Sequence, residues 1–341
     1  MNNTAPQYGR ITATLDSNLH AVLGAACELR YAGGADPGVD LPAHVRAASA
    51  IRRHGSRLVI LQDDVSAIAV LDGHSSLAQP LLLPVGPDGV RVFDDVRGNK
   101  RSKLDLEACV VLPDGRLVAL GSGSKPQREV IVILAQDGST VELAPASEFY
   151  AMLQHHAAAR DARLNIEGAV IQNGLLRLLQ RGNGRASKPD VALWNAILDI
   201  EFAAFLGWLA DRSHVPALRR VLDIDLGQVA GVPYGFTDAT VTRDGRLAFL
   251  ACAEDTLDVG SDGPVLGCRF GWLSDTSDST AVMTEVVEGD GRPTQLKLEG
   301  IEARVDAPEL FDVVADMDRP DEPASIAELR VTRCASHCCS S

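Results

Sequence analysis

Short apolar runs separated by turn dipeptides recur along the chain and predict a mainly β structure. Three pairs of such runs are joined by dipeptides of the same kind: Asp114-Gly115, Asn173-Gly174 and Asp244-Gly245. Asn-Gly or Asp-Gly between two apolar runs is a strong signal for a β-hairpin. After the first of these hairpins come two further apolar runs, residues 130–134 and 140–143. The pattern therefore predicts units of four antiparallel strands.

These units repeat at a nearly constant spacing. Positions 47, 107, 167, 238 and 299 mark the start of each copy, and they are 60, 60, 71 and 61 residues apart. Four of the five positions are acidic, namely Glu107, Glu167, Asp238 and Glu299, whereas Ala47 interrupts the series. Four-stranded units repeated every ~40–60 residues are typical of a β-propeller. We expect one all-β propeller domain over residues 8–332, with five blades. A sixth blade within 8–45 or 185–235 is the alternative.

Segments outside the repeats predict a strand that closes the ring and two inserted helices. The apolar run 8–15 has no hairpin partner of its own, so we expect it to close the last blade beside residues 326–331. Residues 147–160 carry apolar positions at helical spacing and predict a helix between blades. A second inserted helix is expected at 200–209, with Asp199 as its N-cap.

Propeller geometry turns the repeated acids into a candidate site. The start of the inner strand and the loop after the second strand lie on the same face of each blade. The marker acids Glu107, Glu167, Asp238 and Glu299 are therefore expected to form a ring of carboxylates at one mouth of the channel. Converging carboxylates raise one another's pKa unless a cation compensates, and Ca²⁺ is the natural cation for oxygen ligands. Alternatively, the acids bond to backbone N–H groups and lock neighbouring blades together.

The loops after the second strands add charged residues to the same face. Two of them end in Ser-Lys-Pro, at Lys125 and at Lys188, and the corresponding loops elsewhere carry Asp63-Asp64, Glu254-Asp255 and residues 316–323. Gly- and Ser-rich loops with a Lys can hold an anion through their N–H groups. Four basic side chains are thus expected to bind an anionic group of a substrate: Lys125, Arg181, Lys188 and Arg319. The alternative is that these loops are merely relaxed and solvated.

Composition narrows the classes of partner and compartment. A net charge of −14 argues against a nucleic-acid partner, because phosphate binding needs a basic surface. No run of 18 apolar residues is present, so no membrane-spanning helix is expected. The first residues lack the pattern of a secretory signal, which makes the cytoplasm the expected compartment. A small-molecule ligand at the channel mouth is the expected partner.

The seven cysteines form no evident disulfide framework, since their number is odd. Cys109 and Cys252 lie in apolar runs and are expected to be reduced, buried thiols. Residues 333–341 hold Cys334, His337, Cys338 and Cys339 and are expected to form a flexible, oxidation-prone tail. Metal binding by that tail is the alternative.

The repeated strand start, hairpin and polar loop resemble those of the phytase-like, or "esterase-like", β-propeller proteins of bacteria. The segments that carry the resemblance are 105–108, 165–168, 297–300 and 316–323. The pattern is also loosely similar to calcium-bearing propeller hydrolases such as lactonases and gluconolactonases. That similarity implies metal ligands at Glu107, Glu167, Asp238 and Glu299.

Two functions follow as hypotheses. The first is a metal-dependent hydrolase of an ester, lactone or phosphoester, with Glu167 or Glu299 as the general base. The second is a non-catalytic propeller scaffold that binds a small ligand or a protein partner. No recognisable nucleophile motif separates the two.

Overall fold

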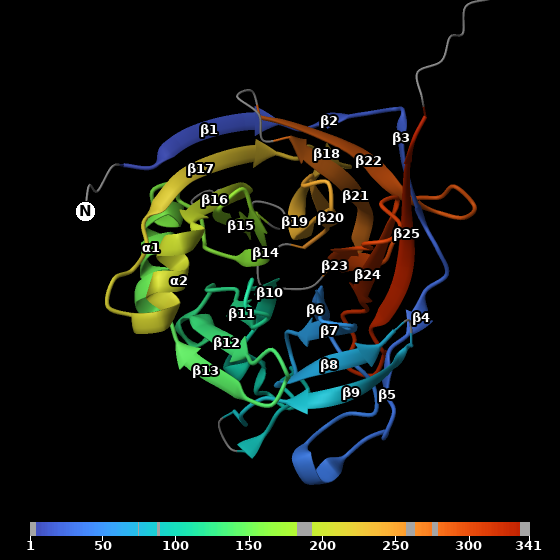
Figure 1. Ribbon diagram of the computed structural model, residues 1–341. Helices are drawn as coiled ribbons and strands as arrows, with labels where there is room; N and C mark the ends of the chain where they lie inside the picture. Colours follow the sequence, from blue (N-terminus) through green and yellow to red (C-terminus); the bar gives the residue numbers. More distant parts are fainter. Residues whose placement is uncertain are drawn as a thin grey trace, which may run out of the picture.

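The strands form radial units around a common axis (Figure 1). This computed structural model describes residues 5–73, 75–86, 89–182, 193–256, 263–274 and 279–334. Five inner strands contact one another in a closed ring, in the order β6 (Ala48–His54), β10 (Leu106–Val111), β14 (Ile166–Gln172), β19 (Val232–Val241) and β23 (Lys297–Ala303). The predicted all-β propeller is confirmed.

Each inner strand is followed by antiparallel strands that run outward. The first unit continues with β7 (Arg57–Gln62), β8 (Ala67–Asp72) and β9 (Leu77–Leu82), and the second with β11 (Leu117–Gly121), β12 (Val130–Leu134) and β13 (Val141–Pro145). The third and fourth continue with β15 (Leu175–Gln180), β16 (Ala196–Glu201), β17 (Leu218–Asp225), and with β20 (Leu247–Glu254), β21 (Val265–Ser274), β22 (Thr280–Glu288). The fifth holds β24 (Leu310–Asp316) and β25 (Ser325–Arg333).

The N-terminal segment closes the ring with a different strand from the one predicted. The fourth strand of the last unit is β3 (Leu19–Leu23), which pairs antiparallel with β25. The predicted run instead forms β1 (Gln7–Thr12) and β2 (Thr14–Leu15), which lie parallel to β17 and β22. The N-terminal segment therefore closes the last unit as expected, but through residues 19–23 in place of 8–15. Short edge strands complete the sheets: β4 (Cys27–Glu28), β5 (Arg30–Tyr31) and β18 (Gln228–Val229).

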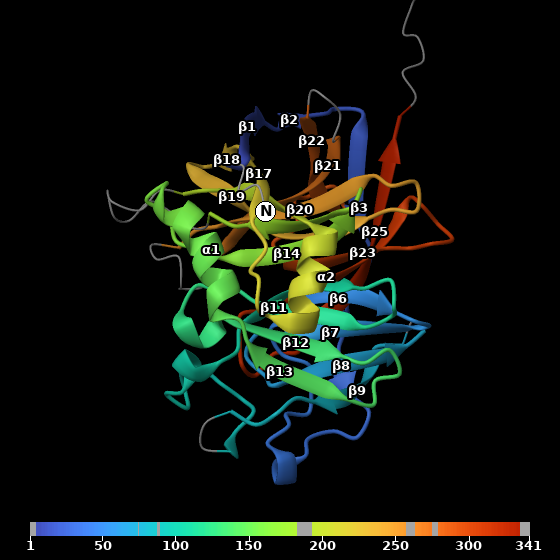
Figure 2. The ribbon, with the colours of Figure 1, turned by 60° about the vertical axis from the view of Figure 1, so that its left-hand side comes forward.

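Two helices fill the space between the second and third units, as Figures 1 and 2 show. Helix α1 (Ser147–Ala158) confirms the prediction, and Phe149 stacks on Trp208 of helix α2 (Phe202–Asp211) with ring centroids 4.8 Å apart. The second helix starts later than predicted, because residues 196–201 continue as β16. Asp199 is therefore a buried strand residue paired with Arg177, and Glu201 holds the N-cap position. Among the described residues, short 3₁₀ turns lie in loops at η1 (Pro37–Val39), η3 (Lys100–Ser102) and η4 (Pro126–Arg128).

The described residues of the two segments considered for a sixth blade belong to the five units. Residues 8–45 supply short outer strands, and the described part of 185–235 supplies β16, α2 and β17. No helix among the described residues is both long and apolar enough to cross a membrane. The predicted Cys-rich tail beyond Cys334 lies outside the described residues.

The prediction of reduced thiols is wrong for Cys252. Its sulfur is bonded to that of Cys268, which lies directly opposite on the neighbouring strand of the fourth unit. Neighbouring strands place such cross-strand side chains within bonding distance. Cys109 is a free, buried thiol as expected, and burial raises its pKa to about 12. An odd number of cysteines therefore did not exclude one local cross-link.

Every inner strand carries a β-bulge at the same place. In each strand the register with its partner shifts around one residue, and these residues are Ser49, Glu107, Glu167, Thr237 and Glu299. A bulge turns a side chain away from the regular alternation of the strand. The hydroxyls of Ser49 and Thr237 donate to the carbonyls of Leu106 and Leu298 on the next inner strand. A carboxylate cannot donate such a bond, so the three glutamates turn toward the cavity at the mouth.

Candidate functional site

An inner chamber of about 80 Å³ lies at the channel mouth, where the bulges converge. Its wall includes the three bulge glutamates Glu107, Glu167 and Glu299. The ends of the second strands and the residues directly after them contribute Asp63, Arg181, Glu254 and Asp316. The starts of the inner strands and the residues just before them contribute Lys103, Asp105, Asn165 and Lys297. Strand starts and second-strand loops thus meet on one face, as the repeat predicts.

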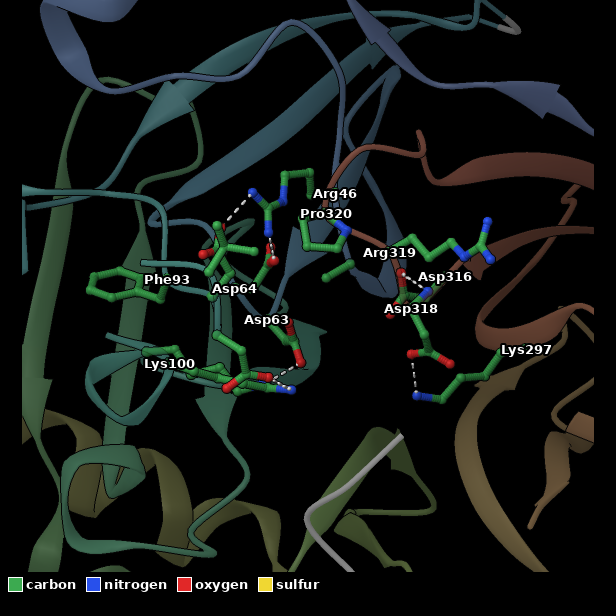
Figure 3. A pocket seen from close by; sticks show the side chains of 15 residues that line it. Arg46, Asp63, Asp64, Phe93, Lys100, Lys297, Asp316, Asp318, Arg319 and Pro320 are labelled. Atoms are coloured by element: carbon green, nitrogen blue, oxygen red, sulfur yellow. Dashed lines mark hydrogen bonds and ion pairs between the residues drawn. The ribbon is translucent and has the colours of Figure 1, made fainter. Parts of the chain in front are cut away.

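A larger outer chamber of about 270 Å³ adjoins the inner one (Figure 3). The two share part of their walls, including Asp63, Lys103, Lys297 and Asp316. Arg46 spans the outer chamber and donates to Asp64 at 2.5 Å and to Asp94 at 3.2 Å. An apolar flank is formed by three residues: Phe93, Val96 and Pro320. The mouth is therefore a two-part basin, charged at its floor and partly apolar at its rim.

Arg181 joins three units of the ring. Its guanidinium donates to Glu167 at 3.1 Å and to Glu254 at 3.0 Å, and lies 3.6 Å from Glu299. Lys297 pairs with Glu299 at 3.1 Å and with Asp318 at 3.0 Å. Despite these contacts, the Oε2 atom of Glu299 is buried without a hydrogen-bond partner. The side chain of Glu299 is only 6% exposed, so this oxygen faces neither water nor a donor.

Three carboxylates on the other side of the chamber lie close enough to share a cation. One oxygen each of Asp63, Asp105 and Glu107 falls within 4.8 Å of the others. Lys103 already pairs with Asp63 and, at 2.7 Å, with Asp105, whose second oxygen accepts from Arg128 at 2.6 Å. Glu107 has no hydrogen bond to any described residue. The triad thus combines two partly neutralised acids with one open carboxylate.

Burial and mutual repulsion shift the pKa values of these groups. Burial, followed by the charges of Glu167 and Asp105, raises the pKa of Glu107 well above its usual range. Burial and the nearby Glu299 raise the pKa of Glu167 to about 7, although Arg181 opposes the shift. Burial tends to lower the pKa of Lys103, but Asp105 and Asp63 hold it well above its ordinary value. The chamber therefore contains carboxyl groups that bind a proton near neutral pH beside permanently charged cations.

Asp238 does not belong to the ring of acids, contrary to the prediction. The bulge in β19 places Thr237 at the equivalent position, and Asp238 faces the interior of the channel. There it accepts two hydrogen bonds from Arg52, both 2.8 Å long, and lines neither chamber. In the first unit Ser49, not Ala47, is the counterpart of the glutamates. The ring among the described residues therefore holds three acids and two hydroxyls.

The four predicted anion-binding residues are not brought together. Arg181 lies in the inner chamber, where its two terminal nitrogens pair with three carboxylates and its Nε atom is buried without a hydrogen-bond partner. Arg319 lies at the rim of the outer chamber, where it is exposed and pairs with Glu322. Lys125 lines neither chamber, and Lys188 lies outside the described residues. The described members of this set, Lys125, Arg181 and Arg319, therefore form no basic cluster at the mouth.

Three cations of the basin were not singled out by sequence reasoning: Arg46, Lys103 and Lys297. Each stands within the four residues before a bulge, at Ser49, Glu107 and Glu299 respectively. A basic residue shortly before an inner strand was the signal that could have found them.

Comparisons with known proteins identify a family and a fold. The sequence profile of DUF6929, described as a family of unknown function, matches residues 44–331. This description differs from the phytase-like family that the sequence resembles. No curated protein matches the chain.

Solved structures that resemble the chain do so at low sequence identity. One is an α-L-arabinofuranosidase from Fusarium graminearum, 8% identical with a TM-score of 0.45, where the match covers 90% of this chain and 98% of that one. Another is the PQQ-bound aldose sugar dehydrogenase of Streptomyces coelicolor, 12% identical with a TM-score of 0.41, covering 92% and 98%. A luciferin-regenerating enzyme is 12% identical with a TM-score of 0.39, covering 85% and 80%. At such identities the likeness concerns the fold alone.

Proposed function

The chain belongs to the DUF6929 family, and from the chemistry of its channel mouth we propose that it is a hydrolase of an ester, lactone or phosphoester, assisted by a bound divalent cation, Ca²⁺. The observation that carries this proposal is the convergence of Asp63, Asp105 and Glu107 in a chamber that also holds Glu167. The expected base is Glu167, and Glu299 is the second candidate.

Of the three acids Asp63, Asp105 and Glu107, Glu107 is the one best suited to bind a hard cation. Its carboxylate is nearly buried, accepts no hydrogen bond from a described residue, and lies among other acids. Such a carboxylate is stabilised when a cation binds, because the cation offsets both desolvation and repulsion. Asp63 and Asp105 share their charge with Lys103, so Glu107 is the principal ligand and the two aspartates complete the set. Carboxylate oxygens are the ligands that Ca²⁺ prefers.

A bound Ca²⁺ would polarise the carbonyl or phosphoryl oxygen of the substrate and lower the pKa of a water molecule. Side chains of the chamber would accept the proton and stabilise the developing negative charge. Glu167 titrates near pH 7, which suits a general base at neutral pH. Asn165 donates to one of its oxygens and Arg181 to the other, so the carboxylate is held in a fixed orientation. Arg181 and Lys297 also supply positive charge near the place where negative charge develops.

The proposed hydrolysis balances with these groups. The oxygen of water bonds to the carbonyl carbon or phosphorus, and Glu167 takes the proton that the water loses. The bond to the leaving oxygen then breaks, and the proton on Glu167 passes to that oxygen. The carboxylate of Glu167 is thereby restored.

The test is an assay of chelator-treated protein against a lactone, an aryl ester and an aryl phosphoester, with and without added Ca²⁺. We expect turnover of one class that depends on Ca²⁺ and falls by ~10²–10⁴-fold in Glu167→Gln, the usual contribution of a general base. Glu148→Gln, an exposed carboxylate on α1, is the matched control and should leave turnover unchanged. Turnover that is equal in Glu167→Gln would overturn the assignment of the base.

One observation favours a second function, a non-catalytic ligand-binding scaffold. Arg181 connects Glu167, Glu254 and Glu299, which come from the third, fourth and fifth units. Such a network of ion pairs holds the units together, and this structural role does not require a catalysed reaction. If the three substrate classes are inert with Ca²⁺ present, the scaffold function is the one supported.

A further inference from the structure

The inner chamber of the mouth is small. Its volume of about 80 Å³ is that of about three water molecules, since each occupies ~30 Å³ in the liquid. The outer chamber, at about 270 Å³, has more than three times that volume. The two also differ in chemistry, because Asp105, Glu107 and Glu167 line the inner chamber and not the outer one. A molecule that extends through both must place a small group among these acids and its larger part outside.

The wall of the inner chamber does not yield easily to a larger group. The side chains of Lys103, Arg181 and Lys297 are each 10% exposed or less, and each pairs with at least two carboxylates. Arg181 in addition connects three units of the ring. Moving one of these cations aside would separate a buried ion pair, which is strongly unfavourable. The volume of the chamber therefore limits what can enter it.

The proposed hydrolysis determines what this volume must hold. The attacking water and the reacting carbon have to lie beside Glu167, which lines the inner chamber. The water takes roughly one third of the space, and a bound Ca²⁺ would leave less. The remainder is about two water-sized groups, which a carbonyl group and a methyl group fill. These two groups are the acyl part of an acetyl ester. A methyl ester would place one atom more in the same space, and the ring of a lactone several more.

We propose that the substrates of the basin are acetyl esters, with the acetyl group in the inner chamber and the alcohol or phenol part in the outer one. This inference rests on the proposed hydrolase function for the reaction, and on the two chambers alone for the size limit. The oxygen of water bonds to the acetyl carbon, and the bond from that carbon to the alcohol oxygen breaks. The proton passes through Glu167 to that oxygen, so the products are acetic acid and the free alcohol or phenol.

Ser49 allows the chamber to be changed by a single methyl group. Its side chain belongs to the wall of the inner chamber, and its hydroxyl donates to the carbonyl of Leu106. Thr237 stands at the equivalent bulge of the fourth unit, makes the equivalent bond to Leu298 at 2.6 Å, and lines neither chamber. The fold therefore accepts Thr at such a bulge. Ser49→Thr keeps the hydroxyl and adds a methyl group at the chamber, and Thr237→Ser is the reverse change away from it.

The test measures kcat/KM for phenyl acetate, phenyl butanoate and phenyl hexanoate, which share one leaving group, with hydrolysis in buffer subtracted. We expect kcat/KM to fall by about tenfold or more from acetate to butanoate, the effect of methylene groups that a site does not hold, and to fall further for hexanoate. Ser49→Thr should lower kcat/KM for phenyl acetate by about tenfold or more, whereas Thr237→Ser should leave it unchanged. Equal kcat/KM for the three esters, or no effect of Ser49→Thr, would overturn the inference.

A binding measurement separates this inference from the proposed function. Calorimetry on the whole chain compares N-phenylacetamide with N-phenylbutanamide, the amides that match the first two esters in shape. Tighter binding of the acetamide without hydrolysis of any ester supports the size limit and overturns the hydrolase. Hydrolysis of the esters without a preference for acetate supports the hydrolase and overturns the size limit. Equal binding of both amides, or binding of neither, with no ester hydrolysed overturns both.

Discussion

Arg52 and Asp238 form a two-pronged ion pair inside the propeller channel. Both terminal nitrogens of Arg52 donate to the carboxylate, each at 2.8 Å. The same guanidinium also donates to backbone carbonyls of Ile51, Ala169, Ala239 and Ile301, which belong to four of the five inner strands. The pair therefore ties most of the ring together below the mouth.

Replacing Asp238 by Asn should destabilise the protein without affecting the mouth. The change leaves the buried Arg52 without its counter-charge, which costs about 3–5 kcal/mol for a buried pair. Urea unfolding measures this loss, and Ca²⁺ titration should show unchanged affinity. Asp244→Asn, at an exposed turn, is the control with a small effect expected. A loss of Ca²⁺ affinity in Asp238→Asn would restore this residue to the metal site.

The stability of the protein should fall as pH rises from about 5 to 7. Burial and neighbouring carboxylates raise the pKa values of four acids. The pKa values of Glu167 and Asp64 rise to about 7, and those of Glu107 and Asp316 rise well above their usual range. In that window the folded state holds more protons than the unfolded state, so deprotonation favours unfolding.

Glu167→Gln isolates one of these groups. Because Gln does not titrate, the difference in unfolding free energy between variant and wild type should grow with pH in favour of the variant up to about pH 7. Chemical denaturation at several pH values provides the measurement, with Glu148→Gln for comparison. A difference that stays flat between pH 5 and 7 would show that Glu167 has an ordinary pKa.

Lys103 should compete with Ca²⁺ for Asp63 and Asp105. Lys103→Met removes the ammonium that pairs with both carboxylates and leaves them buried together. Without Ca²⁺ the variant should unfold at lower temperature, and added Ca²⁺ should raise its Tm by more than in wild type. Differential scanning calorimetry with and without Ca²⁺ tests this. An equal Ca²⁺-induced shift in both proteins would mean that the cation does not use these aspartates.

Cys252 and Cys268 should resist alkylation until the unfolded protein is reduced, since they form a cross-strand disulfide. Peptide mapping after alkylation of protein from its native cell measures this. The bond closes a loop of 16 residues and should contribute ~3 kcal/mol to stability. Full alkylation without reductant would show that the thiols are reduced, as expected in the cytoplasm.

The sequence was sufficient to predict the propeller and one face of its site. Hairpin dipeptides and the regular spacing of Glu107, Glu167 and Glu299 identified the inner strands and placed the three glutamates at one mouth. This worked because a repeat places equivalent residues at equivalent points of the ring. The second-strand loops, with Asp63 and Glu254, followed from the same geometry.

The errors came from features that depend on single-residue register. Asp238 follows the bulged residue Thr237, and a shift of one residue sends a strand side chain to the other face. Nothing local distinguishes Asp238 from a ring acid, because its partner Arg52 lies 186 residues away in sequence. The pairing of Arg181 with three carboxylates is likewise visible only once the units are assembled.

Calorimetric titration of chelator-treated protein with Ca²⁺ decides whether Glu107 forms a cation site. We expect one site in wild type, binding weakened by about tenfold or more in Glu107→Gln, and unchanged binding in Glu148→Gln. Absence of binding in wild type, or equal affinity in Glu107→Gln, would mean that Glu107 holds no cation and that the acids act as locks between units.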